Sequence, residues 1–268
     1  MNLALSLVIA LTGLAWSPHG WTQEAHAQGS ATKKIELTAD QVLEKFVEAT
    51  GGRQAYEKLT SFVARGTLDI PAQGIRGTIQ IYAKAPNKLL VIQTVEGVGE
   101  LRQGYDGQVA WSQDPFQGLR EMDGVELANF KREATFNAEL KWRELYEKVE
   151  LIGTEKVGDH QTYVIRLTPH LGRPITQYYD AETFLLLRQD SVYEGPQGTI
   201  PGQEYFSDYR EVSGVKVPFR VVQKSSLGEA VMSLTSINPN VKIDDARFTK
   251  PTAGDQKETR QGKRSGTE

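Results

Sequence analysis

Apolar and polar residues alternate with a period of two over much of the chain. Between residues 64 and 70 the apolar or small residues all occupy even positions, whereas Arg65, Thr67 and Asp69 occupy odd ones. Residues 75–84 alternate in the same manner, after a turn that contains proline and glycine. This pattern is typical of antiparallel strands that bury one face and expose the other. It predicts a half-buried hairpin.

Further strands are expected on both sides of the middle of the chain. Lys88–Val95 is apolar at both odd and even positions, which predicts a strand that is covered on both faces or lines a pocket. Asp106-Gly107 is a signal for a tight hairpin. The later segments with strand character are 149–152, 163–167, 175–179, 184–189, 205–210, 215–222 and 230–237.

Two stretches carry a helical pattern instead. Thr38 and Gln41 have the spacing of a capping box, and Gly51-Gly52 is a stop signal for the helix that would begin there. Between Met122 and Tyr146 apolar residues recur three and four apart, as on an amphipathic helix. We therefore expect one helix and a short helical piece at 53–59 before the first strand, and a helical insertion between strands.

The N-terminal residues have the layout of a secretory signal peptide. Met1–Ala15 is apolar and uncharged, and Ala25-His26-Ala27 matches an A-x-A cleavage site. The apolar run is shorter than the roughly 20 residues that span a bilayer, which favours cleavage after Ala27 over an uncleaved membrane anchor. The sequence therefore predicts a signal peptide at 1–27 and a mature protein in the bacterial periplasm.

The rest of the chain is expected to contain one folded domain. Residues 28–37 have the character of a short linker. Residues 252–268 are almost free of apolar side chains, so they cannot bury enough surface to offset the entropy of ordering. This leaves a single domain at 38–251, followed by a disordered tail.

The amino-acid composition of the chain argues against several classes of function. The chain has no cysteine, which excludes disulfides, thiolate nucleophiles, cysteine-based zinc sites and a lipid-anchored cysteine. The formal net charge is -3 and no block of basic residues is present, which argues against nucleic-acid binding. A soluble exported protein is the class that remains.

Residues suited to catalysis are few. His160 and His170 both lie in predicted turns, where histidines are usually solvated, and they lack the spacing of a metal site. The sequence has no nucleophile elbow, P-loop or G-x-G-x-x-G motif. We therefore expect no enzyme activity, no metal and no cofactor. An enzyme would need carboxylates that converge with one of these histidines in a single cleft.

Aromatic residues gather around the helical insertion and the strands before it. Most of them are expected in an ordinary core. A strongly curved antiparallel sheet closed by helices nevertheless often leaves a cavity, as small barrels do. The pattern therefore favours a protein that binds something apolar. The aromatic residues concerned are Trp111, Phe116, Phe130, Phe136 and Trp142.

Several short motifs together are similar to one family. Residues 84–87 resemble a (K/R)-x-P-N turn, residues 106–111 a D-G-x-x-x-W hairpin, and residues 244–249 a closing D-A-x-F motif. On these motifs the chain resembles the LolA/LolB-like superfamily of bacterial periplasmic lipoprotein carriers. Residues 179–188 and 205–219 are similar to exported proteins described as outer-membrane lipoprotein-sorting-like.

The resemblance implies a mainly β (α+β) fold, a strongly curved antiparallel half-barrel of about 11 strands with helices on its concave side. Between sheet and helices it implies a cavity for acyl chains. The carriers have an arginine just before the Pro-Asn pair, where this chain has Ala85. On this mapping the expected cavity residues are Leu68, Ile79, Ile81, Leu89, Val91, Trp111, Phe130 and Leu187.

Two functional hypotheses follow from this resemblance. The first is a monomeric, non-catalytic periplasmic carrier for lipid or lipoprotein acyl chains, neither integral to the membrane nor bound to nucleic acid. It predicts a preformed apolar cavity. The alternative is an envelope sensor or protein-interaction module with the same fold. That alternative predicts a filled core and a contiguous exposed apolar patch.

Overall fold

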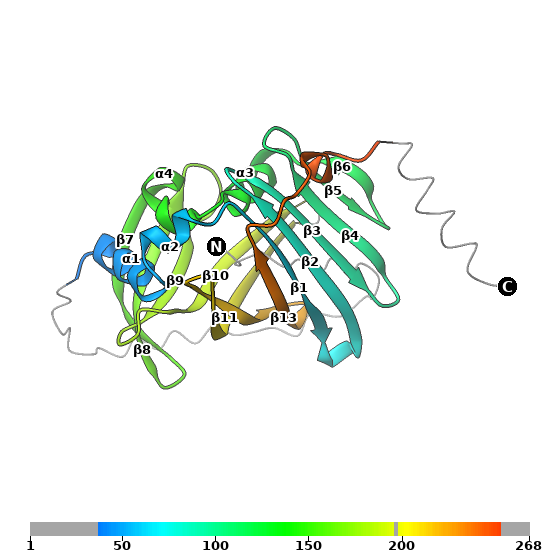
Figure 1. The fold of residues 1–268 in the computed structure, drawn as a ribbon. Coiled ribbons are helices and arrows are strands. Elements are labelled where there is room, and N and C mark those ends of the chain that lie inside the picture. The colour runs from blue at the N-terminus through cyan, green and yellow to red at the C-terminus, as the bar shows by residue number, and fades with distance from the viewer. Residues whose placement is uncertain (1–36, 196–197, 253–268) are drawn as a thin grey trace.

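One antiparallel sheet of 13 strands makes up most of the described protein. The computed structural model describes residues 37–195 and 198–252. The predicted signal peptide at 1–27, most of the predicted linker and tail residues 253–268 lie outside this described part. The sheet is open and curls into a half-barrel (Figure 1). The expected half-barrel is therefore confirmed, with 13 strands where about 11 were expected.

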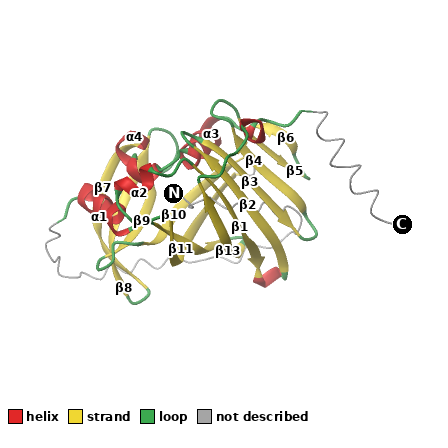
Figure 2. Cartoon of the chain, in the orientation of Figure 1, coloured by secondary structure: helices red, strands yellow, loops and turns green. Residues whose placement is uncertain are grey.

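The strands come in two runs with helices before and between them (Figure 2). The described helical segments are α1 (Ala39–Ala49), α2 (Arg53–Glu57), α3 (Gly124–Ala134), α4 (Trp142–Leu145) and the 3-10 turns η1 (Pro71–Gln73), η2 (Ala138–Leu140) and η3 (Asp245–Phe248). The first run of strands is β1 (Ser61–Ile70), β2 (Ile75–Lys84), β3 (Lys88–Val95), β4 (Gly99–Tyr105), β5 (Ala110–Asp114) and β6 (Gly118–Glu121). The second run is β7 (Tyr146–Val157), β8 (His160–Pro169), β9 (Ile175–Asp180), β10 (Leu186–Gly195), β11 (Gly198–Val212), β12 (Val215–Ser225) and β13 (Gly228–Pro239).

Each run folds as successive hairpins, and β1 and β13 join the two runs. The strand order is β6-β5-β4-β3-β2-β1-β13-β12-β11-β10-β9-β8-β7. Strands β6 and β7 are thus the two edges, although the helical insertion alone separates them in sequence. The chain from α3 to α4 therefore runs from one edge to the other, across the open side of the sheet (Figure 1).

Helix α1 begins at the N-cap that the sequence predicts. Thr38 Oγ1 accepts a hydrogen bond from Gln41 N at 3.2 Å, and Gln41 Oε1 accepts one from Thr38 N at 2.7 Å. This reciprocal pair satisfies two backbone donors at the helix N-terminus. The helix ends at Ala49, just before Gly51 and Gly52, whose φ angles of 127° and 81° are disfavoured for other residues. The predicted capping box and stop signal are both confirmed.

Close backbone packing accompanies the strong curvature. A Cβ atom on Gly66 would lie 2.4 Å from Ser233 O, and one on Gly77 would lie 2.4 Å from Thr94 O. The pairing of β1 with β13 also shifts register between Arg65 and Gly66. A register shift and glycines without side chains both let a sheet bend sharply.

The main core lies between the concave face of the sheet and the helices. Alternate residues of each strand point into it, as the period-two pattern predicts. Helix α1 contributes one apolar stripe, and α3 contributes two buried residues. The strand residues expected at the cavity that are buried in this core are Leu68, Ile79, Ile81, Leu89 and Val91, and the helix residues are Val42, Leu43, Val47, Phe130 and Ala134.

A second, smaller core lies on the opposite, convex face. After β13 the chain crosses the outside of the first run of strands, where η3 and the residue Ile243 pack against it (Figure 1). Lys84 and Lys88 hold Asp245 there, each with Nζ 2.7 Å from one of its carboxylate oxygens. Strand β3 is consequently covered on both faces, as its continuous apolar run predicts. The buried residues of this core are Val63, Tyr82, Leu90, Trp111, Ile243 and Phe248.

The three family-like motifs meet at this convex core. Trp111 ends the D-G-x-x-x-W motif, and its Nε1 donates a hydrogen bond of 3.0 Å to the backbone oxygen of Phe248, in the closing motif. Lys84, from the turn motif, donates hydrogen bonds to Asp245 and to the backbone oxygen of Ile243. The motifs therefore fasten the C-terminal segment to the outside of the sheet.

Candidate ligand-binding site

The helices form a cover over the concave face. Trp142 Nε1 in α4 donates a hydrogen bond of 2.7 Å to Asp40 Oδ1 in α1, and Arg143 lies 3.1 Å from the same oxygen. Phe46 of α1 packs edge-on against Tyr179 of β9, with ring centroids 5.2 Å apart. Helices α1 and α4 are thus tied to each other and to the second run of strands.

In the described part of the chain, two of the cavities lie between this cover and the sheet. They have volumes of about 70 Å³ and about 80 Å³, and both are lined in part by Arg132 and Tyr146. Cavities of this size hold a few water molecules. An acyl chain does not fit in either of them unless the cover moves.

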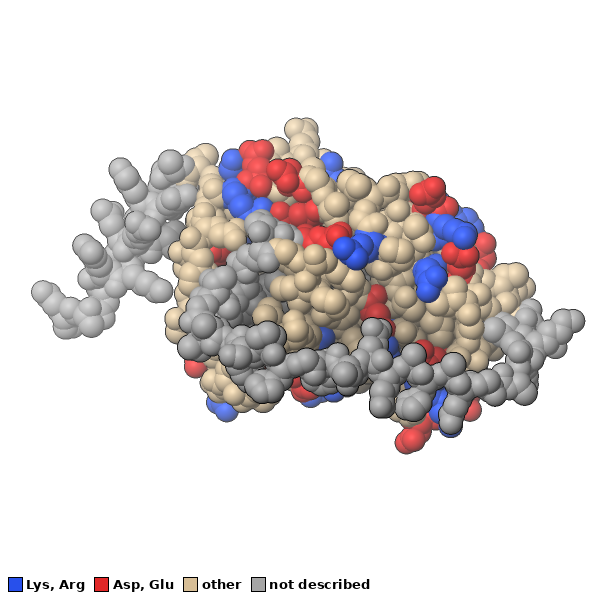
Figure 3. Space-filling model, turned by 180° about the vertical axis from the view of Figure 1, so that it is seen from behind, with Lys and Arg blue, Asp and Glu red and all other residues tan. Residues whose placement is uncertain are grey.

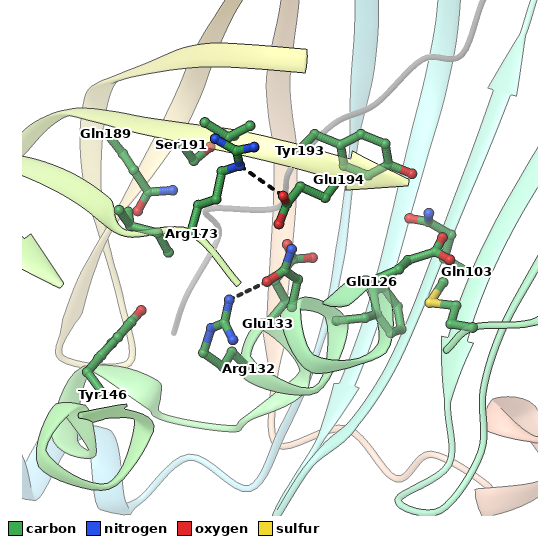
Figure 4. Close-up of a pocket in the computed structure, with 15 residues that line it drawn as sticks. Gln103, Glu126, Arg132, Glu133, Tyr146, Arg173, Gln189, Ser191, Tyr193 and Glu194 are labelled. Atoms are coloured by element: carbon green, nitrogen blue, oxygen red, sulfur yellow. Dashed lines mark hydrogen bonds and ion pairs between the residues drawn. The ribbon is translucent and has the colours of Figure 1, made fainter. Parts of the chain in front are cut away.

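The first cavity lies between α3 and strand β10, and its walls combine charged and polar side chains with apolar ones (Figure 4). Glu194 accepts a hydrogen bond of 2.9 Å from Arg173 Nε. Glu126 makes a two-pronged pair with Arg120 of β6, at 2.6 and 2.7 Å. These acidic side chains are therefore already neutralised by arginines at the cavity rim.

The second cavity lies beneath α1 and α4 and is rich in aromatic side chains. Burial raises the pKa of Tyr56, Tyr179 and Tyr209 well above the ordinary value of 10.0. All three are consequently neutral phenols at physiological pH. Their rings supply apolar surface, while Tyr209 donates a hydrogen bond of 2.8 Å to the backbone oxygen of Leu186.

Arg132 of α3 lies between the two cavities. Its guanidinium donates to the backbone oxygens of Leu171, at 3.1 Å, and Ala128, and to the side chain of Asn129. Burial lowers the pKa of Arg132, whereas the nearby Tyr146 and Glu133 raise it. The side chain fastens α3 to the turn between β8 and β9.

A chain of hydrogen-bonded polar side chains runs along the concave wall. Tyr179 OH donates to Gln177 Oε1 at 2.6 Å, and Gln177 Nε2 donates to Gln189 Oε1 at 2.8 Å. Gln189 Nε2 then donates to Glu204 Oε2 at 3.0 Å. Glu204 is 1% exposed, and its Oε1 has no hydrogen-bond partner. We name this row, Tyr179, Gln177, Gln189 and Glu204, the polar row.

Glu204 is kept neutral by its surroundings. Burial, followed by the nearby charge of Glu133, raises the pKa of Glu204 to about 8, although the hydrogen bond from Gln189 lowers it. A carboxyl group with this pKa is mainly protonated at neutral pH. Because Oε2 accepts from Gln189, the proton is best placed on Oε1.

The structure distributes the expected cavity residues over three locations. Phe130 lines the first cavity. Leu68, Ile79, Ile81, Leu89 and Val91 are buried in the main core on the concave side, outside the described lining of the two cavities. Trp111, expected at the cavity, instead lies in the convex core, because its neighbour Ala110 occupies the concave position.

Leu187 occupies an intermediate position. It falls at a register shift between Leu186 and Arg188 in the pairing of β10 with β9. Leu186 supplies the buried side chain and lines the second cavity, whereas Leu187 is half-buried. The register shift therefore places Leu186, and not Leu187, in the lining of the second cavity.

The polar row has a weak signal in the sequence, which was missed. Gln177 lies two residues from both Ile175 and Tyr179, and Glu204 lies two residues from Phe206. A polar residue at an inward position of an otherwise apolar alternation is a candidate for a buried polar group. A single polar position also fits a strand end, so this signal does not identify the row by itself.

The groups that an enzyme or a metal site would need do not converge in the described part of the chain. His160 and His170 are both exposed, and neither lines the two cavities. Within residues 37–195 and 198–252, no cluster of three or more metal-ligating side chains is present. The same residues contain no helix that is long and apolar enough to cross a membrane.

Charged side chains are mixed on the face shown in Figure 3, where acidic and basic residues are interspersed. Surface ion pairs of the described chain include Arg210 with Asp208 at 2.5 Å and Lys224 with Glu229 at 3.5 Å. Interspersed charges of both signs produce no broad field of a single sign. This face therefore offers no electrostatic surface for a highly charged partner.

The sequence matches no protein-family model and no curated protein. Solved structures are nevertheless similar in fold. The LolA superfamily protein NE2245 from Nitrosomonas europaea is 17% identical, with a TM-score of 0.55 over 80% of this chain and 98% of that chain. A DUF1329 family protein from Desulfovibrio piger is 15% identical, with a TM-score of 0.54 over 79% of this chain and 97% of that chain.

A third similar structure is an outer membrane lipoprotein-sorting protein domain from Vibrio parahaemolyticus. It is 11% identical, with a TM-score of 0.55 over 79% of this chain and 97% of that chain. Identities this low establish the fold and leave the function open. The open antiparallel half-barrel with helices on its concave side therefore has the LolA-like fold.

Proposed function

We propose that this protein is a periplasmic binding protein or carrier for the acyl chains of lipids or lipoproteins, and that it is not an enzyme. The observation that carries the proposal is the apolar concave wall of β1, β2 and β3, which shares one core with the buried residues of α1 and α3. Five inward residues of these strands, Leu68, Ile79, Ile81, Leu89 and Val91, are each at most 3% exposed.

Helix α3 is the part of the cover best suited to move. Only Phe130 and Ala134 of its eleven residues are buried. Leu127 is partly buried against the same core, and the other anchors are polar, namely the pair of Glu126 with Arg120 and the hydrogen bond of Arg132 to the β8–β9 turn. Polar anchors of this kind can exchange with water at small net cost.

The energy balance permits such an opening. Exposing the buried side chains of α3 costs roughly 2–4 kcal/mol at typical burial coefficients. Each methylene of an acyl chain that takes their place gains about 0.8 kcal/mol. About five methylenes would offset the opening, and common membrane acyl chains are longer.

One observation favours the alternative hypothesis of a sensor or protein-interaction module. The two cavities are small, as expected for a half-barrel filled by its own side chains. That hypothesis also requires a contiguous exposed apolar patch. The large exposed apolar residues of the described chain instead belong to five separate segments: Phe116, Leu171 and Leu227 lie in three different turns, Ile152 on the edge strand β7 and Val241 after β13.

Native mass spectrometry distinguishes the two functions. The protein would be purified from a bacterial periplasm without detergent, and its mass compared before and after lipid extraction. A stoichiometric lipid or acylated peptide is the expected result. A ligand-free mass that stays unchanged after incubation with phospholipid and lipopeptide would favour the protein-interaction module.

A further inference from the structure

The polar row ends in a buried carboxyl oxygen that has no hydrogen-bond partner, within the wall of the half-barrel. Gln177, Gln189 and Glu204 lie side by side on β9, β10 and β11, because the register pairs Gln177 with Gln189 and Gln189 with Glu204. Each glutamine uses its amide oxygen to accept and its amide nitrogen to donate along the row. This order leaves Glu204 Oε1 as the one oxygen of the row's carboxyl without a partner.

An unpaired polar atom in such a place is costly to the folded protein. Leaving a buried donor without an acceptor costs free energy, because the group has lost its hydrogen bonds to water. The neutral form of Glu204 limits this cost but does not remove it. A buried polar group of this kind calls for an unseen partner.

Glu204 is placed where a bound chain would pass. Its row neighbour Gln189 lines the first cavity, and Phe206, the next inward residue of β11, lines the second. Glu204 itself lines neither cavity, and its carboxyl group is buried in the sheet wall beside these two neighbours. A chain that joined the two cavities by displacing the cover would run past Oε1.

We propose that Glu204 Oε1 donates a hydrogen bond to an ester or amide carbonyl of a bound acyl chain. This inference rests on the proposed lipid-binding function. A carbonyl oxygen is a neutral acceptor that accompanies acyl chains into apolar surroundings, so it satisfies the donor without bringing a charge into the wall. Glu204 would then fix the boundary between the head group and the hydrocarbon chains of the bound lipid at this point of the concave wall.

The surroundings disfavour a free fatty acid at this position. A carboxylate beside Glu204 would need an unpaired cation nearby. Arg120 and Arg173 are engaged by Glu126 and Glu194, and Arg132 is held by backbone oxygens and Asn129. Glu133 adds a negative charge close to Glu204. The site therefore selects esters and amides over acids.

The test compares two lipids that differ only in the carbonyl groups. Vesicles of dihexadecanoyl phosphatidylglycerol supply the ester lipid, and vesicles of its dihexadecyl ether analogue supply a lipid without carbonyls. Binding to periplasm-purified protein is measured for the wild type, Glu204→Gln and Glu204→Leu. The glutamine variant keeps an N–H donor at this position, whereas the leucine variant removes it. Circular dichroism and thermal melting establish that both variants are folded.

The wild type is expected to bind the ester lipid roughly three- to tenfold more tightly than the ether lipid, the range of one neutral hydrogen bond. Glu204→Gln should retain this preference and Glu204→Leu should abolish it. Equal wild-type affinity for both lipids, or a preference that survives in Glu204→Leu, would overturn the inference while lipid binding itself stands. Binding of neither lipid would instead overturn the proposed function.

Discussion

Gln189 Nε2 donates a hydrogen bond of 3.0 Å to Glu204 Oε2 on the inner wall of the half-barrel. Both side chains are almost fully buried, at 5% and 1% exposure. The wall of this barrel is consequently not uniform. Its first run of strands presents mainly apolar side chains, with Gln93 and Gln103 as inward polar exceptions, and its second run carries the polar row among aromatic rings.

The raised pKa of Glu204 makes stability depend on pH. The folded protein holds the proton up to about pH 8, whereas an unfolded glutamate releases it near 4.5. Between these values the folded state binds more protons, so the free energy of unfolding falls as the pH rises, by up to about 1.4 kcal/mol per pH unit. Glu204→Gln should remove most of this slope, as measured by urea denaturation from pH 5 to pH 8.

The control for this experiment is Glu211→Gln, an exposed glutamate on the same strand. It should leave the pH dependence of the wild type unchanged. A Glu204→Gln protein with the same slope as the wild type would show that Glu204 is ionised in the folded state, contrary to its raised pKa.

Gly104 is expected to tolerate no side chain. A Cβ atom there would lie 2.4 Å from both Cε2 and Cζ2 of Trp111. Gly104→Ala should destabilise the protein by about 1–3 kcal/mol through overpacking of the convex core, as measured by chemical denaturation. Gly202→Ala is the matched control, because a Cβ there meets only Lys224 O, at 3.7 Å. Similar stabilities of the two variants would contradict this packing.

Phe248 anchors the C-terminal segment and should matter for stability rather than for ligand binding. It is fully buried in the convex core, with the indole of Trp111 bonded to its backbone oxygen. Phe248→Ala should lower the free energy of unfolding by about 3–5 kcal/mol. Phe116→Ala, which removes a ring that is 51% exposed, should change it little. Loss of lipid binding in folded Phe248→Ala protein would contradict the structural role.

Asp180 is expected to contribute stability that is lost in acid. Its Oδ1 accepts hydrogen bonds from the backbone nitrogens of Glu182 and Thr183 and from Thr183 Oγ1. Burial alone would raise the pKa of Asp180, but these bonds and the one with His160 lower it below the ordinary 3.8. Because the folded pKa is the lower one, the stabilisation is complete above pH 4 and disappears as the pH falls further.

Asp180→Asn should therefore lower stability at pH 7 by about 1–3 kcal/mol and flatten the loss of stability below pH 4. Thermal melting across pH 2.5 to pH 7 measures both effects. Asp159→Asn, an exposed position in the neighbouring turn, should reproduce the wild-type curve. An unchanged acid limb in Asp180→Asn would mean that the carboxylate does not contribute in this way.

Sequence patterns over a few residues predicted those features of the fold that depend on neighbouring residues. The capping box of Thr38 and Gln41, the alternation of β1 and β2 and the Asp106-Gly107 hairpin all appear as expected. Strand β6 was not expected, since Gly118–Glu121 contains one apolar residue. It is a strand because the edge of β5 pairs with it.

Sequence patterns over a few residues could not predict side-chain orientations that depend on contacts between residues far apart in the chain. Ala110 and Trp111 are adjacent and both apolar, so alternation alone does not say which of them faces inward. The answer comes from Phe248, 137 residues away, which accepts the indole hydrogen bond on the convex face. The register shift after Leu186 likewise depends on pairing with β9, which no spacing in β10 encodes.

The central claim is that acyl chains bind against the inward face of β1, β2 and β3. Photo-crosslinking tests it with a phospholipid that carries a diazirine near the methyl end of one acyl chain, followed by peptide mass spectrometry. Adducts are expected on Ile81, Leu89 or Val91 and on Phe130, with none on Leu90, which belongs to the convex core. Adducts on Leu90 or only on exposed residues such as Phe116 would contradict this claim.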